Sequence, residues 1–231
     1  MSAPGIAEDN SAESDWLAVD QYLVDTLLGA DPSLDHALAA NAEAGLPAID
    51  VSRTNGEMLG ILVRAIGARR VLEVGTLGGF STILLARGVG PEGAVVSCEY
   101  EPKHAQIARS NIDRAGVGDR VDIRIGAALD TLAALADEGA ESFDFVFLDA
   151  DKENNANYLE RSMALTHPGS LIVVDNVIRR GASADPDADD ARTRGTRAAL
   201  AWLGADDRVD ATAIQTVGTK GWDGFAMAIV R

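Results

Sequence analysis

Hydrophobic and polar positions follow two patterns along the chain, and the change falls near residue 68. Before it, apolar residues recur at the spacing of amphipathic helices. After it, short and nearly continuous apolar runs alternate with amphipathic stretches. The apolar runs cover 71–74, 94–98, 121–125, 143–148 and 170–174. Because apolar strands that alternate with helices are typical of a parallel sheet covered on both faces, the pattern predicts an α/β fold.

The stretches between these runs predict the covering helices. They lie over 79–87, 102–115, 129–136 and 155–166. After Asp175 a polar loop leads to a helix over 192–203, and two last strands follow over 209–216 and 225–230. The glycine-rich segment 218–224 favours a hairpin turn, which predicts that these two strands are antiparallel.

The N-terminal part predicts a helical cap. Residues 1–14 are small, polar and acidic, which indicates a mobile tail. Ser14 or Asp15 is expected to cap a first helix, and two more helices are expected over 33–44 and from Arg53 or Thr54 to residue 67. We therefore expect one domain over 15–231, with a cap over 15–67 and an α/β core over 68–231.

The length, charge and cysteine content of the chain exclude several classes of function. The 231 residues suit one α/β domain, and the net charge of −16 argues against nucleic acid and anionic membranes as partners. Cys98 is the only cysteine, so an intramolecular disulfide is excluded, which fits a reducing compartment. The N-terminus has no basic segment followed by an apolar run, so neither a signal peptide nor a transmembrane helix is expected. A cytoplasmic enzyme is the resulting expectation.

The first apolar run ends in a glycine-rich turn that begins at Glu73. Its pattern is E-x-G-x-x-G-G and not the G-x-G-x-x-G of dinucleotide sites. A pyrophosphate needs free backbone N–H groups and no adjacent negative charge, whereas a cationic ligand tolerates the Glu73 carboxylate. S-adenosylmethionine carries a sulfonium and an ammonium. The alternative interpretation is an ordinary strand-to-helix turn.

The next two runs add weaker signals for an adenosine ligand. Glu99 ends the second run, where a carboxylate can accept hydrogen bonds from both ribose hydroxyls of either NAD or S-adenosylmethionine. Gly126, Ala127 and Ala128 follow the third run. Such small residues suit the lining of an adenine slot, and they equally suit the start of a helix.

Two aspartates follow the fourth and fifth runs. If those strands pair, Asp149 and Asp175 come together, with the carbonyl of Asn176 beside them. Two unpaired carboxylates at close range are unfavourable, and a bound cation removes the conflict. Oxygen ligands favour Mg²⁺, with Mn²⁺ or Ca²⁺ as alternatives. The other interpretation is that both aspartates cap the helices that follow.

Lys152 lies three residues after Asp149. Beside a metal its ammonium is disfavoured by like charge, so its amine can act as general base on an acceptor hydroxyl. Alternatively, Lys152 is a surface residue that offsets Asp151 and Glu153.

Taken in order, these segments resemble the cation-dependent O-methyltransferase family, which includes catechol and caffeoyl-coenzyme A O-methyltransferases. The resemblance runs from Ile49 to the C-terminus, and five segments carry it. They are 70–81 (RVLEVGTLGGFS), Glu99, 148–152 (LDADK), 175–178 (DNVI) and 223–226 (DGFA).

The resemblance implies a Rossmann-like S-adenosylmethionine-dependent methyltransferase fold. Its seven-stranded sheet is mostly parallel and its last strand antiparallel. It implies Asp149, Asp175 and Asn176 as metal ligands, Lys152 as the catalytic base, and a metal-held acceptor with two vicinal oxygens. The cofactor-binding residues predicted in all are Val51, Glu73, Gly75, Thr76, Ser81, Glu99, Ala127, Ala128 and Asp149. The family also suggests a homodimer.

The sequence departs from the family at Phe80 and Asn155, where tyrosine is common, and the acceptor therefore stays unidentified. Arg179 and Arg180 either contact an acidic acceptor or pair with the aspartates of 185–190. Two other functions compete with a methyltransferase. One is a non-catalytic S-adenosylmethionine-binding protein, although all four metal and base positions are filled. The other is an NAD-dependent oxidoreductase, which the glycine spacing disfavours.

Overall fold

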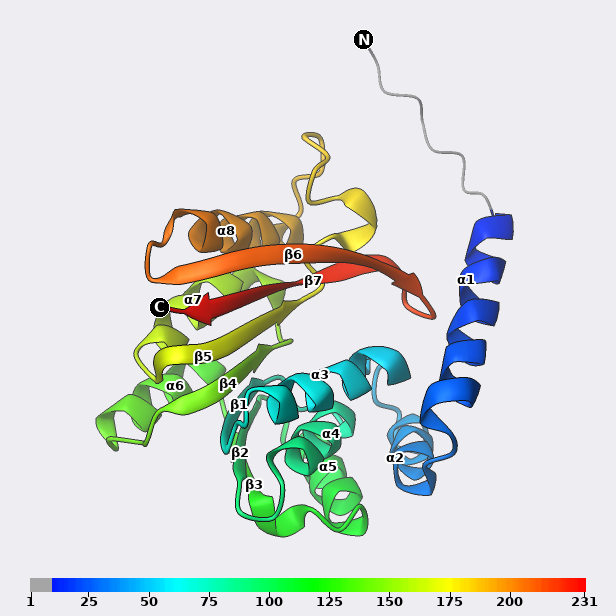
Figure 1. Cartoon of the computed structure of the whole chain (residues 1–231), viewed down its shortest axis with the longest axis horizontal. Coiled ribbons are helices and arrows are strands. Elements are labelled where there is room, and N and C mark those ends of the chain that lie inside the picture. Colours follow the sequence, from blue (N-terminus) through cyan, green and yellow to red (C-terminus); the bar gives the residue numbers. More distant parts are fainter. Residues whose placement is uncertain (1–9) are drawn as a thin grey trace.

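The computed structural model describes residues 10–231, and its centre is a single seven-stranded sheet (Figure 1). The strand order is β3-β2-β1-β4-β5-β7-β6. Strands β1 to β5 pair in parallel, and β7 is antiparallel to both of its neighbours, β5 and β6. The strands are β1 (Arg70–Val74), β2 (Ala94–Glu99), β3 (Val121–Ile125), β4 (Phe143–Leu148), β5 (Thr166–Asp175), β6 (Val209–Gly218) and β7 (Gly221–Val230). The predicted fold class is thereby confirmed.

Helices cover both faces of the sheet, with α3, α4 and α5 on one face and α6, α7 and α8 on the other (Figure 1). The α-helices are α1 (Asn10–Leu23), α2 (Pro32–Glu43), α3 (Arg53–Ala65), α4 (Phe80–Val89), α5 (Pro102–Arg114), α6 (Ala128–Asp137), α7 (Asn155–Met163) and α8 (Ala191–Ala205). Short helical turns cover Val24–Leu28, Gly118–Arg120, Lys152–Asn154 and Arg179–Gly181. None of the helices between residues 10 and 231 is long and apolar enough to cross a membrane.

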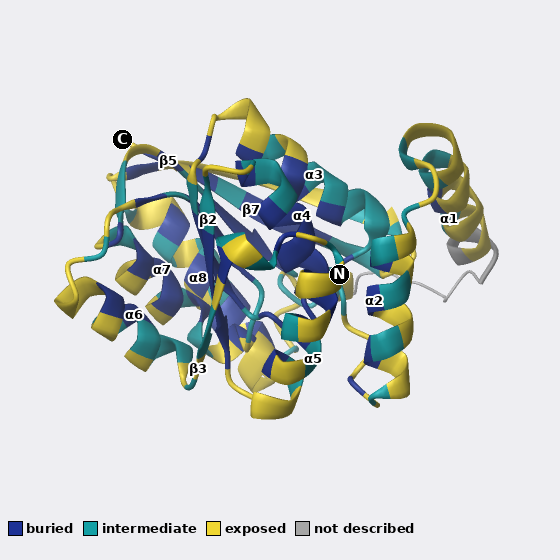
Figure 2. Cartoon of the chain, turned by 90° about the horizontal axis from the view of Figure 1, so that it is seen from below, coloured by how far each residue is buried: buried dark blue, intermediate teal, exposed yellow. Residues whose placement is uncertain are grey.

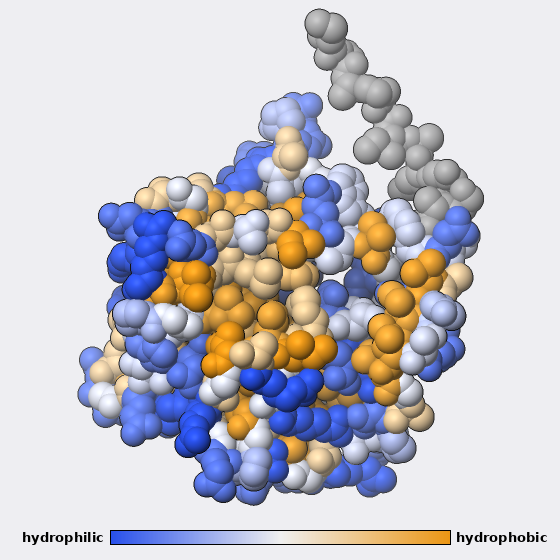
Figure 3. All heavy atoms as spheres, in the orientation of Figure 1, coloured by the Kyte–Doolittle hydropathy of each residue, from blue (hydrophilic) through white to orange (hydrophobic). Residues whose placement is uncertain are grey.

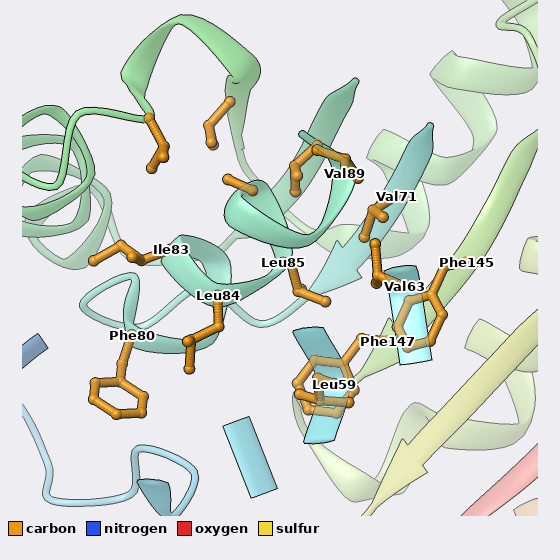
Figure 4. Packing of buried hydrophobic residues seen from close by; sticks show 14 of the residues in the cluster. Leu59, Val63, Val71, Phe80, Ile83, Leu84, Leu85, Val89, Phe145 and Phe147 are labelled. Atoms are coloured by element: carbon orange, nitrogen blue, oxygen red, sulfur yellow. The ribbon is translucent and has the colours of Figure 1, made fainter. Parts of the chain in front are cut away.

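Alternate residues of the central strands fill two separate cores. Phe145 and Phe147 of β4 pack with Leu59 and Val63 of α3 (Figure 4). Their neighbour Val146 faces the opposite core, which also contains the buried Cys98. Because a slip of one residue would exchange the two faces, this alternation fixes the strand register and so the positions of the residues at the strand ends.

The structure corrects two predicted boundaries. The helix expected over 155–166 ends at Met163, and residues 166–169 already belong to β5. The chain turns at Ala164 and Leu165, and the Leu165 carbonyl already accepts a hydrogen bond from the Phe143 N–H at the start of β4 (2.8 Å), so pairing with the sheet replaces the last helical turn. The turn expected over 218–224 consists of Thr219 and Lys220 alone. Gly224 lies within β7, where a Cβ would overlap the carbonyl oxygen of Ile214, so this glycine permits close approach of two strands.

The N-terminal helix differs from expectation as well. It begins at Asn10, inside the segment predicted to be a mobile tail, and residues 1–9 of that tail lie outside the described residues. Figure 2 shows α1 set apart from the body, and it packs against β6. Figure 3 shows apolar side chains on this helical segment, across a hollow from the outer strands. Large apolar side chains exposed there include Leu17, Val19, Tyr22 and Leu27.

Candidate active site

The candidate site lies where the strand order reverses, between β1 and β4. Ligands of open α/β sheets bind at such a point, beyond the carboxyl ends of the strands. Gly75 follows β1 and Asp149 follows β4, and the Asp149 N–H donates to the carbonyl of Val74 (2.8 Å). Gly75 has φ +105°, and a Cβ there would overlap the Asp149 carbonyl oxygen. Only glycine therefore permits this approach of the two strand ends.

Asp149 and Asp175 follow paired strands. Leu148 of β4 is in register with Val174 of β5, so the two aspartates occupy equivalent positions at the sheet edge. Neither is the N-cap of a helix, which removes the capping interpretation. Asn176 follows with φ +59°, and its N–H donates to the Asp175 carboxylate (2.8 Å). The predicted juxtaposition of these strand ends is confirmed.

Asp175 is buried, with 9% of its surface exposed. Burial, followed by the nearby negative charge of Asp149, raises the pKa of Asp175 above its ordinary value. Two carboxylates and an amide oxygen match the ligand preference of Mg²⁺, so the donor set fits such a cation. Between residues 10 and 231 no group of three or more His, Cys, Asp or Glu side chains could hold a metal ion. The set of two carboxylates and one amide stays a prediction.

Lys152 is not a surface residue. Its side chain is buried, and its Nζ donates to Asp149 Oδ1 at 2.7 Å. Asp151, one of the acidic neighbours proposed to offset it, instead accepts hydrogen bonds from Asn154 and Tyr158. The structure thus places the candidate base directly on a candidate metal ligand.

The Glu73 side chain lies in the protein interior. It is fully buried, and its carboxylate accepts hydrogen bonds from the hydroxyls of Ser81 (2.6 Å), Thr82 (2.5 Å) and Ser97 (2.6 Å). Burial raises the pKa of Glu73 to about 7. The hydroxyl of Thr76 forms a hydrogen bond with that of Ser97 (2.6 Å). Three of these residues, Glu73, Thr76 and Ser81, were predicted to contact the cofactor. Their side chains connect the end of β1 and the glycine loop with β2 and α4.

Glu99 lies at the end of β2 and is tied to the same loop. Its Oε2 accepts a hydrogen bond from the Leu77 N–H (2.8 Å) and its Oε1 from the Glu101 N–H (2.9 Å). His104 Nδ1 lies 3.4 Å from Oε1. Each carboxylate oxygen has a second acceptor site, so Glu99 can also receive ribose hydroxyls. Ala127 and Ala128 follow the end of the neighbouring strand, β3. Ala127 is exposed and is the N-cap residue of α6, and Ala128 is half-buried and is the first residue of that helix.

Two cavities lie on the side of the site that faces the cap. The larger, about 560 Å³, lies between α1, α2 and the segment 46–54. The smaller, about 240 Å³, contains Asp175 and Asn176 in its wall, and Val51 lines both cavities. Of the other predicted site residues, Gly75, Glu99, Ala127, Ala128, Asp149 and Lys152 lie outside these walls.

Four residues bear on the identity of the acceptor: Phe80, Asn155, Arg179 and Arg180. Phe80 lines the larger cavity, whereas Asn155 is completely buried and lines neither. Arg179 and Arg180 also line neither cavity. Hydrogen bonds from Thr193 are the main reason that the pKa of Asp190 is lowered, and the charge of Arg179 contributes less, so the aspartate-pairing interpretation stays a prediction.

A chain of buried amides, not anticipated from the sequence, connects the glycine loop with the cavities. Asn111 of α5 donates to the Gly78 carbonyl (2.9 Å) and to Asn41 Oδ1 (3.0 Å), and Asn41 donates to Asp50 (2.9 Å). Asn41 and Asp50 line the larger cavity. The signal was present, because Asn41 follows Leu34 at the i+7 spacing that places both on the buried face of α2.

Comparison with known proteins agrees with this architecture. A sequence model of the O-methyltransferase family matches residues 30–227. The chain is 56% identical over 213 residues to the catechol O-methyltransferase of Mycobacterium tuberculosis, an alignment that covers 92% of this chain and 95% of that protein. The sheet order and the strand-end site are those of a Rossmann-like methyltransferase fold. The chain belongs to the O-methyltransferase family.

Solved structures show the same fold. An O-methyltransferase from Bacillus cereus, in complex with SAH, has a TM-score of 0.93 at 51% identity and covers 94% of this chain and 99% of its own. TomG from Streptomyces achromogenes, an O-methyltransferase involved in tomaymycin synthesis and solved with SAM, has a TM-score of 0.91 at 43% identity. That comparison covers 94% of this chain and 98% of TomG.

Proposed function

We propose that this chain transfers a methyl group from S-adenosylmethionine to one hydroxyl of a small catechol-like acceptor, with the help of a divalent cation. One observation carries the proposal: Asp149 and Asp175 end neighbouring strands, and the Lys152 amine is bonded to Asp149. A candidate cation site and a candidate base therefore share one carboxylate.

The cofactor assignment rests on the loop between β1 and α4. Gly75 lets this loop approach the end of β4, and Glu99 presents a carboxylate already oriented by the Leu77 and Glu101 N–H groups. Such a fixed carboxylate can accept hydrogen bonds from both ribose hydroxyls. The glycine loop lacks the spacing that would favour a dinucleotide pyrophosphate, and related structures contain SAH or SAM.

Asp149, Asp175 and Asn176 would hold the cation, with Mg²⁺ favoured and Mn²⁺ or Ca²⁺ as alternatives. When bound, it would acidify an acceptor hydroxyl and neutralise the two carboxylates. Lys152 would accept the hydroxyl proton at Nζ, the atom that contacts Asp149. Val51 and the N-terminal helices would exclude water from the reacting atoms.

Two features support a small acceptor with vicinal hydroxyls. The cavity beside Asp175 has a volume of about 240 Å³, which suits a compact ligand. Two vicinal oxygens can complete the coordination of a cation that has only three protein ligands. The relatives named as catechol O-methyltransferases agree with such an acceptor.

Methylation assays with catechol and related phenols test the proposal directly, with chromatographic detection of the methyl ether. Calorimetry with S-adenosylmethionine and with NAD, each with and without Mg²⁺, separates the competing functions. Tight binding of S-adenosylmethionine without turnover of any vicinal diol would indicate a binding protein. Selective binding of NAD would indicate an oxidoreductase.

A homodimer and a cytoplasmic location remain part of the proposal. Exposed apolar side chains that a second copy would cover include Leu17, Val19 and Tyr22 of α1 and Ile214 and Val217 of β6. Light scattering on the purified protein tests this assembly.

A further inference from the structure

Gly195 of α8 packs against the backbone of the Lys152 turn. A Cβ at this position would overlap the carbonyl oxygen of Lys152 and would lie 2.7 Å from its carbonyl carbon and 2.6 Å from the Glu153 Cα. These are backbone atoms, which no side-chain rotation can move away. Any residue other than glycine would therefore displace either α8 or the turn that carries Lys152.

The same helix contains a glycine without this constraint. A Cβ at Gly204 would meet no atom within 4 Å. Glycine in a helix interior is about 1 kcal/mol less favourable than alanine, so Gly195 weakens α8, whereas Gly204, the second-last residue of the helix, weakens it less. Of the two, only Gly195 is required by close packing, which explains why glycine is present there despite its unfavourable helix propensity.

Helix α8 is also fixed at its beginning. Asp190 caps it by accepting a hydrogen bond from the Thr193 N–H (3.1 Å). Arg197 donates to the carbonyls of Ser183 (3.0 Å) and Ala188 (2.8 Å) in the preceding loop. Helix α8 is therefore held on both sides of Gly195. A larger side chain at this position would consequently move the short turn Lys152–Asn154 more easily than the helix.

We propose that Gly195 is a positioning residue. By letting α8 pack closely against the Lys152–Asn154 turn, it fixes the position of that turn and so holds the Lys152 amine at the 2.7 Å contact with Asp149. This inference rests on the proposed function, in which Lys152 is the catalytic base. It assigns a positioning role, exerted through the backbone of another residue, to a glycine remote in sequence from the strand-end motifs.

The test compares Gly195→Ala with Gly204→Ala. A displacement of the order of 1 Å at a catalytic group costs roughly 100-fold in rate. Gly195→Ala should therefore lower kcat by about 10- to 100-fold, most strongly for an acceptor with a weakly acidic hydroxyl. Its Kd for S-adenosylmethionine should stay within about twofold of wild type, because the loop after β1 is untouched. Gly204→Ala should keep the wild-type kcat and an equal or higher Tm.

A mutant cycle with Lys152→Ala identifies the route of the effect. If Gly195 acts through Lys152, adding Gly195→Ala to Lys152→Ala should cause almost no further loss. A wild-type kcat in Gly195→Ala, or an equal loss with and without Lys152, overturns the inference. Wild-type activity of Lys152→Ala itself would instead refute the proposed base.

Asp190→Ala provides a second arm if Gly195→Ala does not fold. Loss of an N-cap costs about 1 kcal/mol and loosens the first turns of α8 without adding an atom near Lys152. Its kcat should fall by several-fold, and this loss should disappear in the Lys152→Ala background. A lowered Tm with unchanged kcat would overturn the inference.

Discussion

The amine of Lys152 contacts the carboxylate of Asp149 at 2.7 Å, three residues along the chain and beside the switch point of the sheet. The contact is largely shielded, since the Lys152 side chain is 9% exposed and that of Asp149 19%. An exposed lysine–aspartate pair contributes little, whereas a shielded one constrains both partners. A cation bound at Asp149 would compete with the Lys152 amine for this carboxylate, so the two proposed roles would be coupled.

Replacement of Lys152 tests this coupling. Lys152→Ala should lower kcat by roughly 10²–10⁴, the span for a positioned general base, while binding of S-adenosylmethionine persists. Lys152→Arg supplies a sharper control, because arginine retains the positive charge for Asp149 but does not release its proton. Both variants should show similar losses in kcat, and the loss should shrink for acceptors with more acidic hydroxyls. A near wild-type kcat in Lys152→Arg would show that only the charge is needed.

The cation site is tested through Asp175. Asp175→Asn preserves the size of the side chain but removes its charge, so affinity for Mg²⁺ should fall by about 10- to 100-fold. EDTA should abolish turnover by the wild-type protein, and added Mg²⁺ should restore it. Calorimetric titration with Mg²⁺ measures the affinity, and Glu153→Gln, at an exposed acidic residue nearby, is the matched control. Full turnover in metal-free buffer would contradict the assignment.

The strands could be predicted because each is a short apolar run. Their ends could be located because acidic residues follow several of these runs. Asp149 and Asp175 were expected to meet on the condition that β4 and β5 pair, and the structure contains that pair. The orientation of Glu73 could not be predicted in the same way. Its partners on α4 and β2, Thr82 and Ser97, are brought to it only by the tertiary fold. The constraint at Gly195 depends on the packing of α8 against a distant turn, which no local pattern records.

Cofactor binding is tested at Glu99. Glu99→Gln retains an oxygen acceptor for one of the two backbone N–H groups, but it loses the charge that strengthens bonds to ribose hydroxyls. Loss of hydrogen bonds to a charged group costs about 1.5–3 kcal/mol, so the Kd for S-adenosylmethionine should rise by roughly 10- to 100-fold. Calorimetry measures this change, and Glu101→Gln, at an exposed neighbour, should leave it unaltered. An unchanged Kd in Glu99→Gln would refute the ribose assignment.

Glu73 predicts a pH dependence of stability. Burial raises its pKa from 4.5 to about 7 in the folded protein. Between these values the unfolded chain has released the proton while the folded chain retains it, so unfolding becomes easier as pH rises. The stability associated with the protonated carboxyl is fully present below pH 4.5 and is lost as pH approaches 7. The separation of the two pKa values corresponds to a loss of roughly 3 kcal/mol.

Glu73→Gln isolates this contribution, because glutamine has nearly the same shape and does not titrate. Urea unfolding of both proteins at pH 5 and pH 7.5 gives the free energy of unfolding, and the other titrating groups cancel in the difference between the proteins. Relative to Glu73→Gln, the wild type should lose on the order of 2–3 kcal/mol between these pH values. The hydroxyls of Ser81, Thr82 and Ser97 can reorient toward either side chain, so the variant should fold. The same difference at both pH values would mean that Glu73 is already ionised in the folded protein, with the three hydroxyls offsetting the cost of its burial.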